Sequence, residues 1–250
     1  LHHLTDEGNI KYILANVTGP TSRYFSKNHR SFLWIDDVIL VIDDVCSHED
    51  GTFSLLFHPD GVSRKNGIDL SVVNQQAAVD IRPLWPDYLT ESDFEHDFPY
   101  NLKLKAHQGP KAKKTDEMET YYSVTYPIKA QSVKFITAII LKDSPASKNI
   151  PQVTRLKGDD LQGVRIAKGD KITDVYLNTR ADGHIMHRNS CTNVNGWDTD
   201  AYLLAFSYKK GTDPAVSKNI LEWFIGYGSY VRNAHESIFD SYTKKYKVIR

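Results

Sequence analysis

The sequence predicts an all-β fold, in which antiparallel strands form a large β-sandwich or super-sandwich with few short helices. Apolar and polar residues alternate with a period of two along much of the chain, as they do in strands that bury one face. Gly, Asn, Asp and Pro recur between these stretches, where turns need them. Aromatic residues, which favour strands, make up 11% of the 250 residues and include 14 Tyr.

The clearest strand signal in the first half lies at residues 31–44, SFLWIDDVILVIDD. We expect two strands there, at 32–35 and 38–42, joined by a tight turn at Asp36 and Asp37. The second strand, VILVI, is apolar on both faces and should therefore be central in its sheet. The same alternation predicts further strands at residues 52–58, 67–73, 76–81, 121–127 and 133–141.

The second half continues the pattern. Strands are expected at residues 163–167, 172–178, 183–187, 201–209 and 222–227, with a last one in the tail that ends YKVI. Residues 214–227 could form a short helix, because Pro214 stands early in an apolar pattern of helical spacing. Gly226 and Gly228 weaken that helix, so a loop followed by a strand is favoured.

Two polar segments interrupt the strands. Residues 83–114 are rich in proline and charge, and are expected to form a long surface excursion with a solvated run of lysines. Residues 143–151 form a second polar connector. We therefore expect one β-sandwich domain over residues 1–250, with a soft internal boundary near 143–151.

Composition excludes some classes of partner. Lys plus Arg number 31 and Asp plus Glu also number 31, so the chain has no overall positive field to attract nucleic acid or an anionic membrane. No apolar run approaches the roughly 18 residues that a membrane helix needs. The chain starts with the polar stretch LHHLTDEGN, in which no signal peptide is recognisable. Motifs for nucleotide binding or for a serine nucleophile do not occur.

Three stretches, taken in order, resemble the C-terminal β domain of heparinase II/III-like polysaccharide lyases. The first is His29-Arg30 followed after one residue by FLWIDDVILVIDDVCSHEDGTFSLLFH, and the second is ITDVYLNTRADGHIMHRNSCTNVNGWDTDAYLLAF. The third is GYGSYVR. The likeness covers roughly residues 20–250 and depends on the order and spacing of the stretches rather than on one specific motif. Related lyases of alginate and other uronate polymers share the sandwich, so the resemblance does not fix the substrate.

The resemblance implies both an architecture and a reaction. Such lyases place a helical (α/α) toroid before the sandwich, and the polysaccharide lies between them. No stretch of this chain has the long amphipathic helices of a toroid, so the chain corresponds to the sandwich half. The reaction is a β-elimination, in which a base removes the proton beside the uronate carboxylate and an acid protonates the leaving oxygen. The toroid supplies most of these groups.

The resemblance also implies a histidine near the start of the sandwich. His2 and His3 echo that motif in the stretch HHLTDEGN, and they are the candidate catalytic residues. The spacing to Asp6 is one residue too long, and too few residues separate the motif from Arg30. The alternative is that both histidines belong to a frayed terminus or a linker.

The densest group of polar side chains lies at residues 178–193. Its members Arg180, His184, His187, Arg188 and Asn189 are candidates for binding the carboxylates or sulfates of a polysaccharide. The alternative is the ordinary polar face of an antiparallel sheet. Some relatives hold zinc in the sandwich, and His48 and His58 are the metal-ligand candidates, although their spacing matches no recognised zinc motif. A structural zinc or calcium ion is the only cofactor that this comparison suggests.

The leading hypothesis is the C-terminal sandwich of a bacterial polysaccharide lyase, secreted or periplasmic, that forms one wall of a cleft for an acidic, uronate-containing polymer. Its partners would be that polysaccharide and an N-terminal helical domain. The first alternative is a non-catalytic carbohydrate-binding or structural module. The second is a complete small enzyme that acts on glycosides.

Overall fold

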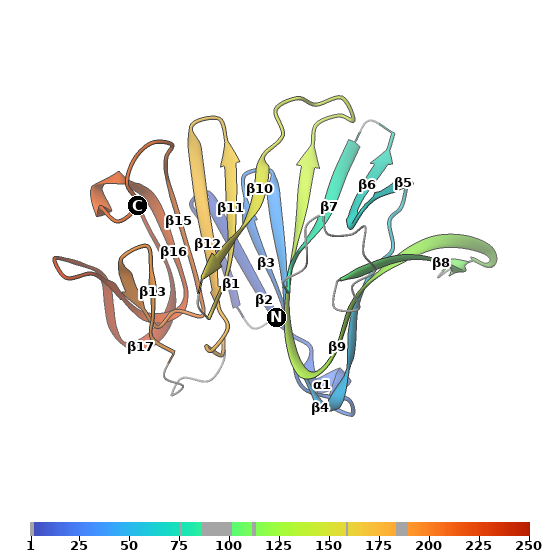
Figure 1. Cartoon of the computed structure of the whole chain (residues 1–250), viewed down its shortest axis with the longest axis horizontal. Helices are drawn as coiled ribbons and strands as arrows, with labels where there is room; N and C mark the ends of the chain where they lie inside the picture. Colours follow the sequence, from blue (N-terminus) through green and yellow to red (C-terminus); the bar gives the residue numbers. More distant parts are fainter. Residues whose placement is uncertain (1–2, 76, 87–101, 112–113, 159, 184–189) are drawn as a thin grey trace. The chain divides into compact units, whose positions relative to one another are not determined.

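The computed structural model describes residues 3–75, 77–86, 102–111, 114–158, 160–183 and 190–250. These residues form almost exclusively antiparallel strands, which confirms the predicted all-β class (Figure 1). The chain divides into two compact units. Unit 1 contains residues 1–4 and 12–150, and unit 2 contains residues 5–11 and 151–250.

The first sheet runs in the order β1-β2-β3-β4-β9-β7-β6-β5, with β8 paired to β9 outside this path. Its strands are β1 (His3–Glu7), β2 (Ile10–Asn16), β3 (Phe25–Ile35), β4 (Val38–Phe57), β5 (Val62–Asn66), β6 (Asp69–Asn74), β7 (Ala77–Trp85), β8 (Lys103–Lys111) and β9 (Lys114–Lys142). A single-turn helix, α1 (Thr18–Thr21), lies between β2 and β3.

The second sheet runs in the order β10-β11-β12-β15-β16-β14-β13, with β17 paired to β16. Its strands are β10 (Gln152–Gly158), β11 (Leu161–Lys168), β12 (Lys171–Asn178), β13 (Thr192–Val194), β14 (Trp197–Thr199), β15 (Leu203–Lys209), β16 (Ile220–Arg232) and β17 (Ser237–Ile249). The 3-10 turn η2 (Ser217–Asn219) precedes β16, so the loop-then-strand interpretation of residues 214–227 is confirmed.

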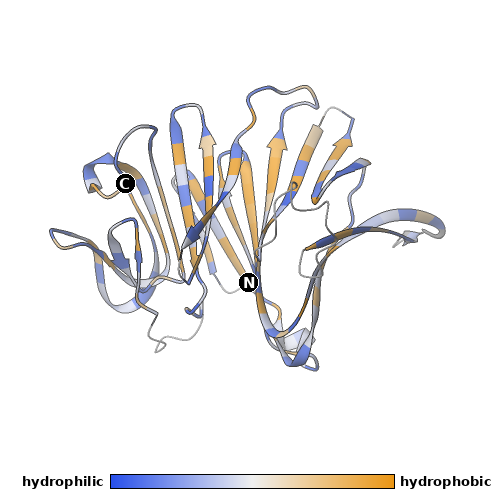
Figure 2. Cartoon of the chain, in the orientation of Figure 1, coloured by the Kyte–Doolittle hydropathy of each residue, from blue (hydrophilic) through white to orange (hydrophobic). Residues whose placement is uncertain are grey.

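The alternation seen in the sequence produces the buried and exposed faces of the strands. Leu33 and Ile35 of β3 are fully buried, whereas Phe32 and Trp34 between them are exposed. Residues 38–42 of β4 are at least half-buried throughout, as expected for a central strand. Figure 2 shows the apolar residues concentrated along the strands, with hydrophilic residues at many of the connecting turns.

Each unit has a core of its own. In unit 1, the ends of β4 and β9 pack with β6 and β7 around Phe53, Leu70 and Phe135. In unit 2, β12, β14, β15 and β16 pack around Trp197, where the Trp223 ring meets it edge-on at a centroid distance of 5.1 Å. Among the described residues, no helix is long and apolar enough to cross a membrane.

The prediction that residues 83–114 form a surface excursion is wrong in part. β7 continues through Trp85, and Lys103–Lys111 forms β8. β8 pairs along its whole length with the first part of β9. Leu102 and Leu104 are buried here, while Lys103 and Lys105 point away from the core. An edge strand tolerates Pro110, because one side of it makes no ladder bonds. Residues 87–101 lie outside the described part.

Candidate functional site

The polar segment that the sequence singles out connects β12 to β13 in unit 2. Asn178, at the end of β12, holds both ends of this segment. Its amide Nδ2 donates to the carbonyl of Ser190, and its Oδ1 accepts a hydrogen bond from the Arg180 backbone N–H at 3.0 Å. Asn178 and Ser190 are both buried, so the polar clamp is shielded from water.

Arg180 is the one predicted binding residue of this segment that the structure describes. Its Nη2 donates to the carbonyl of Cys191 at 2.7 Å, and its Nε lies 3.2 Å from the Asp160 carboxylate. The side chain is nevertheless 53% exposed. A guanidinium has five N–H donors, so Arg180 is positioned by its neighbours and still offers donors to a ligand. His184, His187, Arg188 and Asn189 lie outside the described residues.

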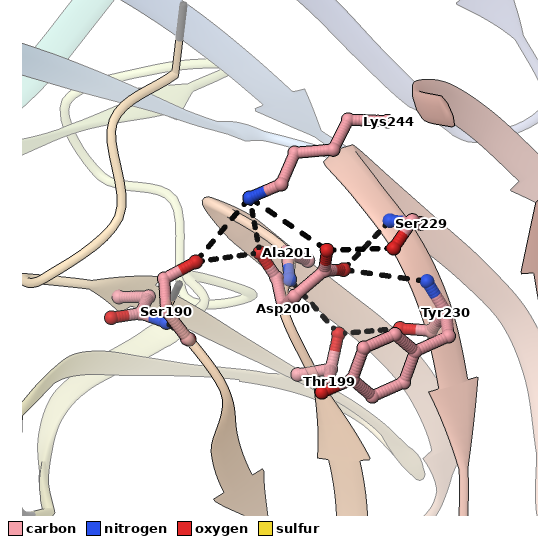
Figure 3. Close-up of polar contacts among 8 residues, drawn as sticks. Ser190, Thr199, Asp200, Ala201, Ser229, Tyr230 and Lys244 are labelled. Carbon is pink, nitrogen blue, oxygen red and sulfur yellow. Dashed lines mark hydrogen bonds and ion pairs between the residues drawn. The ribbon is translucent and has the colours of Figure 1, made fainter. Parts of the chain in front are cut away.

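Asp200 lies beside Ser190, where the described part of the segment resumes, and its carboxylate accepts several hydrogen bonds (Figure 3). Its Oδ1 accepts hydrogen bonds from the backbone N–H groups of Ser229, at 2.7 Å, and Tyr230, at 3.3 Å. Its Oδ2 accepts one from the Ser229 hydroxyl at 2.7 Å. Thr199 joins the same two stretches, because its hydroxyl donates to the Tyr230 carbonyl at 2.8 Å and accepts from the Ala201 N–H at 3.1 Å. These bonds hold the connection between β14 and β15 against β16.

Lys244 of β17 completes this network from the opposite side (Figure 3). Its ammonium donates to the Ser190 hydroxyl at 3.3 Å and to the Asp200 carbonyl at 3.2 Å, and lies 3.7 Å from Asp200 Oδ2. Only 6% of the side chain is exposed. The charge is therefore used to hold Ser190, and hence the segment, in place. It is not presented to solvent as a ligand-binding group.

Two tyrosines flank the same segment. The rings of Tyr227 and Tyr246 have centroids 5.7 Å apart, and the Tyr246 hydroxyl donates to the Gly183 carbonyl at 3.3 Å. Tyr227 has a positive φ of 53°, which is costly for a side chain of this size. Burial, together with the negative charge of Asp182, raises the pKa of Tyr227. Its hydroxyl therefore stays protonated at neutral pH and can donate a hydrogen bond or a proton, but it is a poor base.

Sequence reasoning did not identify Lys244, Asp200 or Tyr227 as parts of this site. Lys244 and Asp200 are 44 residues apart, so no local pattern links them. Tyr227 does carry a signal, since it stands between Gly226 and Gly228 in a strand. A Cβ at Gly228 would lie 2.8 Å from Ala201 Cβ, so β16 approaches the Asp200 segment closely only because this side chain is absent.

The histidines predicted from the start of the chain lie in unit 1. His2 is outside the described residues. His3 begins β1 and is half-buried, with its ring centroid 6.3 Å from that of Tyr12. It therefore belongs to a strand of the sheet.

The two metal-ligand candidates occupy different surroundings. The ring of His48 contacts the Ser22 carbonyl, with its Nε2 at 2.9 Å. The ring of His58 contacts Glu119, with Nδ1 3.4 Å from the carboxylate, and stacks on Tyr121. In the described part of the chain, no group of three or more His, Cys, Asp or Glu side chains is placed to hold a metal ion.

The described part of the site therefore combines a positioned guanidinium with the protonated hydroxyl of Tyr227, both held on a rigid support. Such groups suit recognition of a carboxylate and of sugar hydroxyls.

No protein-family model and no curated protein matches the chain. Solved structures share its fold. The crystal structure of heparinase III matches over 70% of this chain and 27% of its own, at 11% identity and a TM-score of 0.51. A mutant of the heparan sulfate lyase HepC from Pedobacter heparinus matches over 71% of this chain and 27% of its own, at 11% identity and a TM-score of 0.50. This chain thus spans about a quarter of these lyases, and its fold is the all-β sandwich that heparinase III structures contain.

Proposed function

We propose that this chain is the β-sandwich part of a polysaccharide lyase, and that residues 179–191 with their flanking tyrosines form part of one wall of its substrate cleft. The substrate would be an acidic, uronate-containing polysaccharide that is cleaved by β-elimination. A helical domain of the same protein would supply the base. Secretion or a periplasmic location in a bacterium fits a polymer of this kind.

The observation that carries the proposal is the likeness to heparinase III over 70% of this chain. The matched part is 27% of that lyase, which is the share expected for one domain of a larger enzyme. A fold hosts many functions, so the site must support the assignment independently.

β-Elimination requires neutralisation of the uronate carboxylate, protonation of the leaving oxygen and abstraction of the proton beside the carboxylate. The site residues fit the first two of these tasks. Arg180 is exposed and cationic, so it can pair with the uronate carboxylate and favour the charge that develops there. Tyr227 keeps its proton at neutral pH and can donate a hydrogen bond to a sugar oxygen. The proposal assigns the third task, proton abstraction, to the helical domain that the resemblance to polysaccharide lyases implies.

The first experiment measures binding and cleavage separately. The chain is titrated with heparan sulfate, alginate and neutral dextran in a calorimeter, and ultraviolet absorbance is followed for unsaturated uronate ends. We expect binding to at least one uronate polymer, none to dextran, and no cleavage. Arg180→Ala should weaken that binding roughly fivefold to tenfold, because one charge-assisted contact is lost.

Lys210→Ala is the matched control, because it removes one exposed cation from a turn of the same unit. Equal effects of the two substitutions would contradict the assigned role of Arg180. Cleavage by this chain alone would show a complete small enzyme instead. The protein encoded by the whole reading frame should release unsaturated ends. If it binds the polymer without releasing them, the chain is a non-catalytic carbohydrate-binding module.

A further inference from the structure

Two histidines enclose a tyrosine on the surface of unit 1. The Tyr121 ring is stacked on His58 at a centroid distance of 5.1 Å and on His107 at 4.9 Å, with interplanar angles of 13° and 16°. The three residues come from three neighbouring strands. His107 of β8 pairs with Tyr121 of β9, and His58 directly follows Phe57 of β4, which pairs with Tyr122. We call these three residues the His-Tyr-His row.

The strand register places the row on the outer face of the sheet. Neighbouring residues Leu104, Tyr122 and Val124 point to the opposite face and are buried in the core of unit 1. Figure 1 shows β8 running beside the first part of β9. The Tyr121 ring also lies against Gly109, where an added Cβ would be only 3.0 Å from the ring. The aromatic ring is therefore held between two imidazoles and over a glycine.

Charged side chains around the row come from β8 and β9. Lys105 and Lys103 of β8 share its face, two and four residues before His107. Among the described side chains of β8 and β9, Glu119 and Glu117 are the acidic groups on that face, and Glu119 contacts His58. Leu56 and Ser54, on β4, contribute no charge. With neutral imidazoles these two lysines and two glutamates balance, so each protonated histidine adds positive charge to this group of side chains.

We propose that the His-Tyr-His row, with Lys105, is a second binding surface for acidic polysaccharide that gains affinity as the pH falls. The proposal rests on the assigned function only for the class of ligand. Protonated imidazoles offer N–H donors and positive charge to carboxylates and sulfates. The Tyr121 ring stabilises the protonated forms of both His58 and His107, because a cation over the face of an aromatic ring is attracted to it.

The direction of the pH effect follows from charge. Each imidazole that takes up a proton adds one positive charge beside Lys105 and Lys103, so attraction of a polyanion grows as the pH falls. While the imidazoles are neutral, Glu119 and Glu117 offset the two lysines. The His107 Nε2 lies 2.8 Å from the Ser123 hydroxyl, which can accept a hydrogen bond from the imidazolium N–H and hold the ring in place.

The test compares binding at about pH 5.5 and about pH 8, on either side of the imidazole titration. The probes are heparin, which carries uronate and sulfate, and dextran sulfate, which carries sulfate alone. The unaltered chain should bind both polymers roughly fivefold more tightly at the lower pH, because two weak surface charge contacts are gained. The double variant H58Q/H107Q should lose most of this difference and keep its affinity at the higher pH.

His235→Gln is the matched control, since His235 lies in an exposed turn of unit 2. An unchanged pH dependence in H58Q/H107Q, or an equal loss in His235→Gln, would overturn the inference. Dextran sulfate separates the two proposals. Tighter binding of dextran sulfate at low pH supports the row even where no uronate polymer is recognised. Uronate binding that is equal at both pH values supports the lyase proposal and overturns the row.

Discussion

The two units bury carboxylates in their sheets in different ways. In unit 1, Asp44 of β4 is neutralised by two ammonium groups, with Lys27 Nζ at 2.6 Å and Lys134 Nζ at 2.9 Å. In unit 2, Asp174 of β12 receives both arms of the Arg165 guanidinium, at 2.7 and 2.8 Å, and the Tyr208 hydroxyl at 2.9 Å. Lysine acts as a point charge, whereas a guanidinium fork and a hydroxyl fix direction as well.

Hydrogen bonds of fixed direction therefore hold Asp174 of unit 2 in one orientation. Asp200 of the same unit is held in a similar way, because its carboxylate accepts hydrogen bonds from the backbone N–H and the hydroxyl of Ser229. Unit 2 therefore holds residues 179–183 and 190–191 in a fixed geometry, which a binding site requires. In unit 1 the two lysines hold Asp44 by charge, and the His-Tyr-His row lies at the surface. Three predictions sharpen this contrast.

The largest expected effect is that of Asp174→Ala. Asp174 is fully buried, so its removal leaves the Arg165 guanidinium and the Tyr208 hydroxyl without their acceptor. We expect the free energy of unfolding to fall by about 3 to 5 kcal/mol, as when one partner of a buried ion pair is removed. Urea denaturation measures it. Asp198→Ala, which removes an exposed carboxylate of β14, should change stability by less than about 0.5 kcal/mol; equal losses would refute the contrast.

The second prediction compares adjacent carboxylates of β4. Burial alone would raise the pKa of Asp44, but the charges of Lys134 and Lys27 outweigh it and lower that pKa. Burial raises the pKa of Asp43, and its contact with Arg30 only partly offsets this. Asp44→Asn should therefore cost about 2 to 3 kcal/mol at neutral pH, since charge-assisted bonds are lost. Asp43→Asn should cost less than about 1 kcal/mol, because no described residue bonds its Oδ2.

Acid provides a check on the same pair. Because the folded pKa of Asp44 lies below its unfolded value of about 3.9, its contribution is present above that pH and is lost as the pH falls further. The unaltered chain should therefore lose stability below about pH 4, and Asp44→Asn should show a flatter profile. Asp43 has the opposite shift and should not add to this acid loss. A steeper profile in Asp44→Asn than in the unaltered chain would contradict the assignment.

The sequence predicted the class of fold well because alternation is a local property. The stretch SFLWIDDVILVI already contains the end of β3, the two-residue turn and the buried start of β4. It did not predict β8, because Pro110 and the lysines are typical of loops, and only the pairing with β9 makes them an edge strand. Arg180 was identified from its neighbours in the sequence. The Asp200–Lys244 network and the His-Tyr-His row depend on contacts between distant strands, which no local pattern encodes.

An effect on stability smaller than those of Asp174 and Asp44 is expected for Trp34, an exposed side chain of β3. Trp34 is 45% exposed, and its indole N–H is held by the Asp36 carbonyl at 2.6 Å. The register places it beside Ile39 and Ile139, which are half-buried, so the indole is the solvent-exposed end of an apolar row. Trp34→Ala should change the free energy of unfolding by only about 1 kcal/mol, since half of the side chain is already in water.

The same substitution should have a clear effect on a different readout. A hydrophobic dye should bind the unaltered chain, and Trp34→Ala should lower its fluorescence by roughly half, because the exposed indole is removed. Leu221→Ala is the matched control, since Leu221 is similarly exposed but lies on unit 2. An equal loss of fluorescence in both variants would mean that the dye reports scattered apolar residues. A selective loss would mark the surface around Trp34 as a dye-binding surface of unit 1, on the same sheet that buries Asp44 between two lysines.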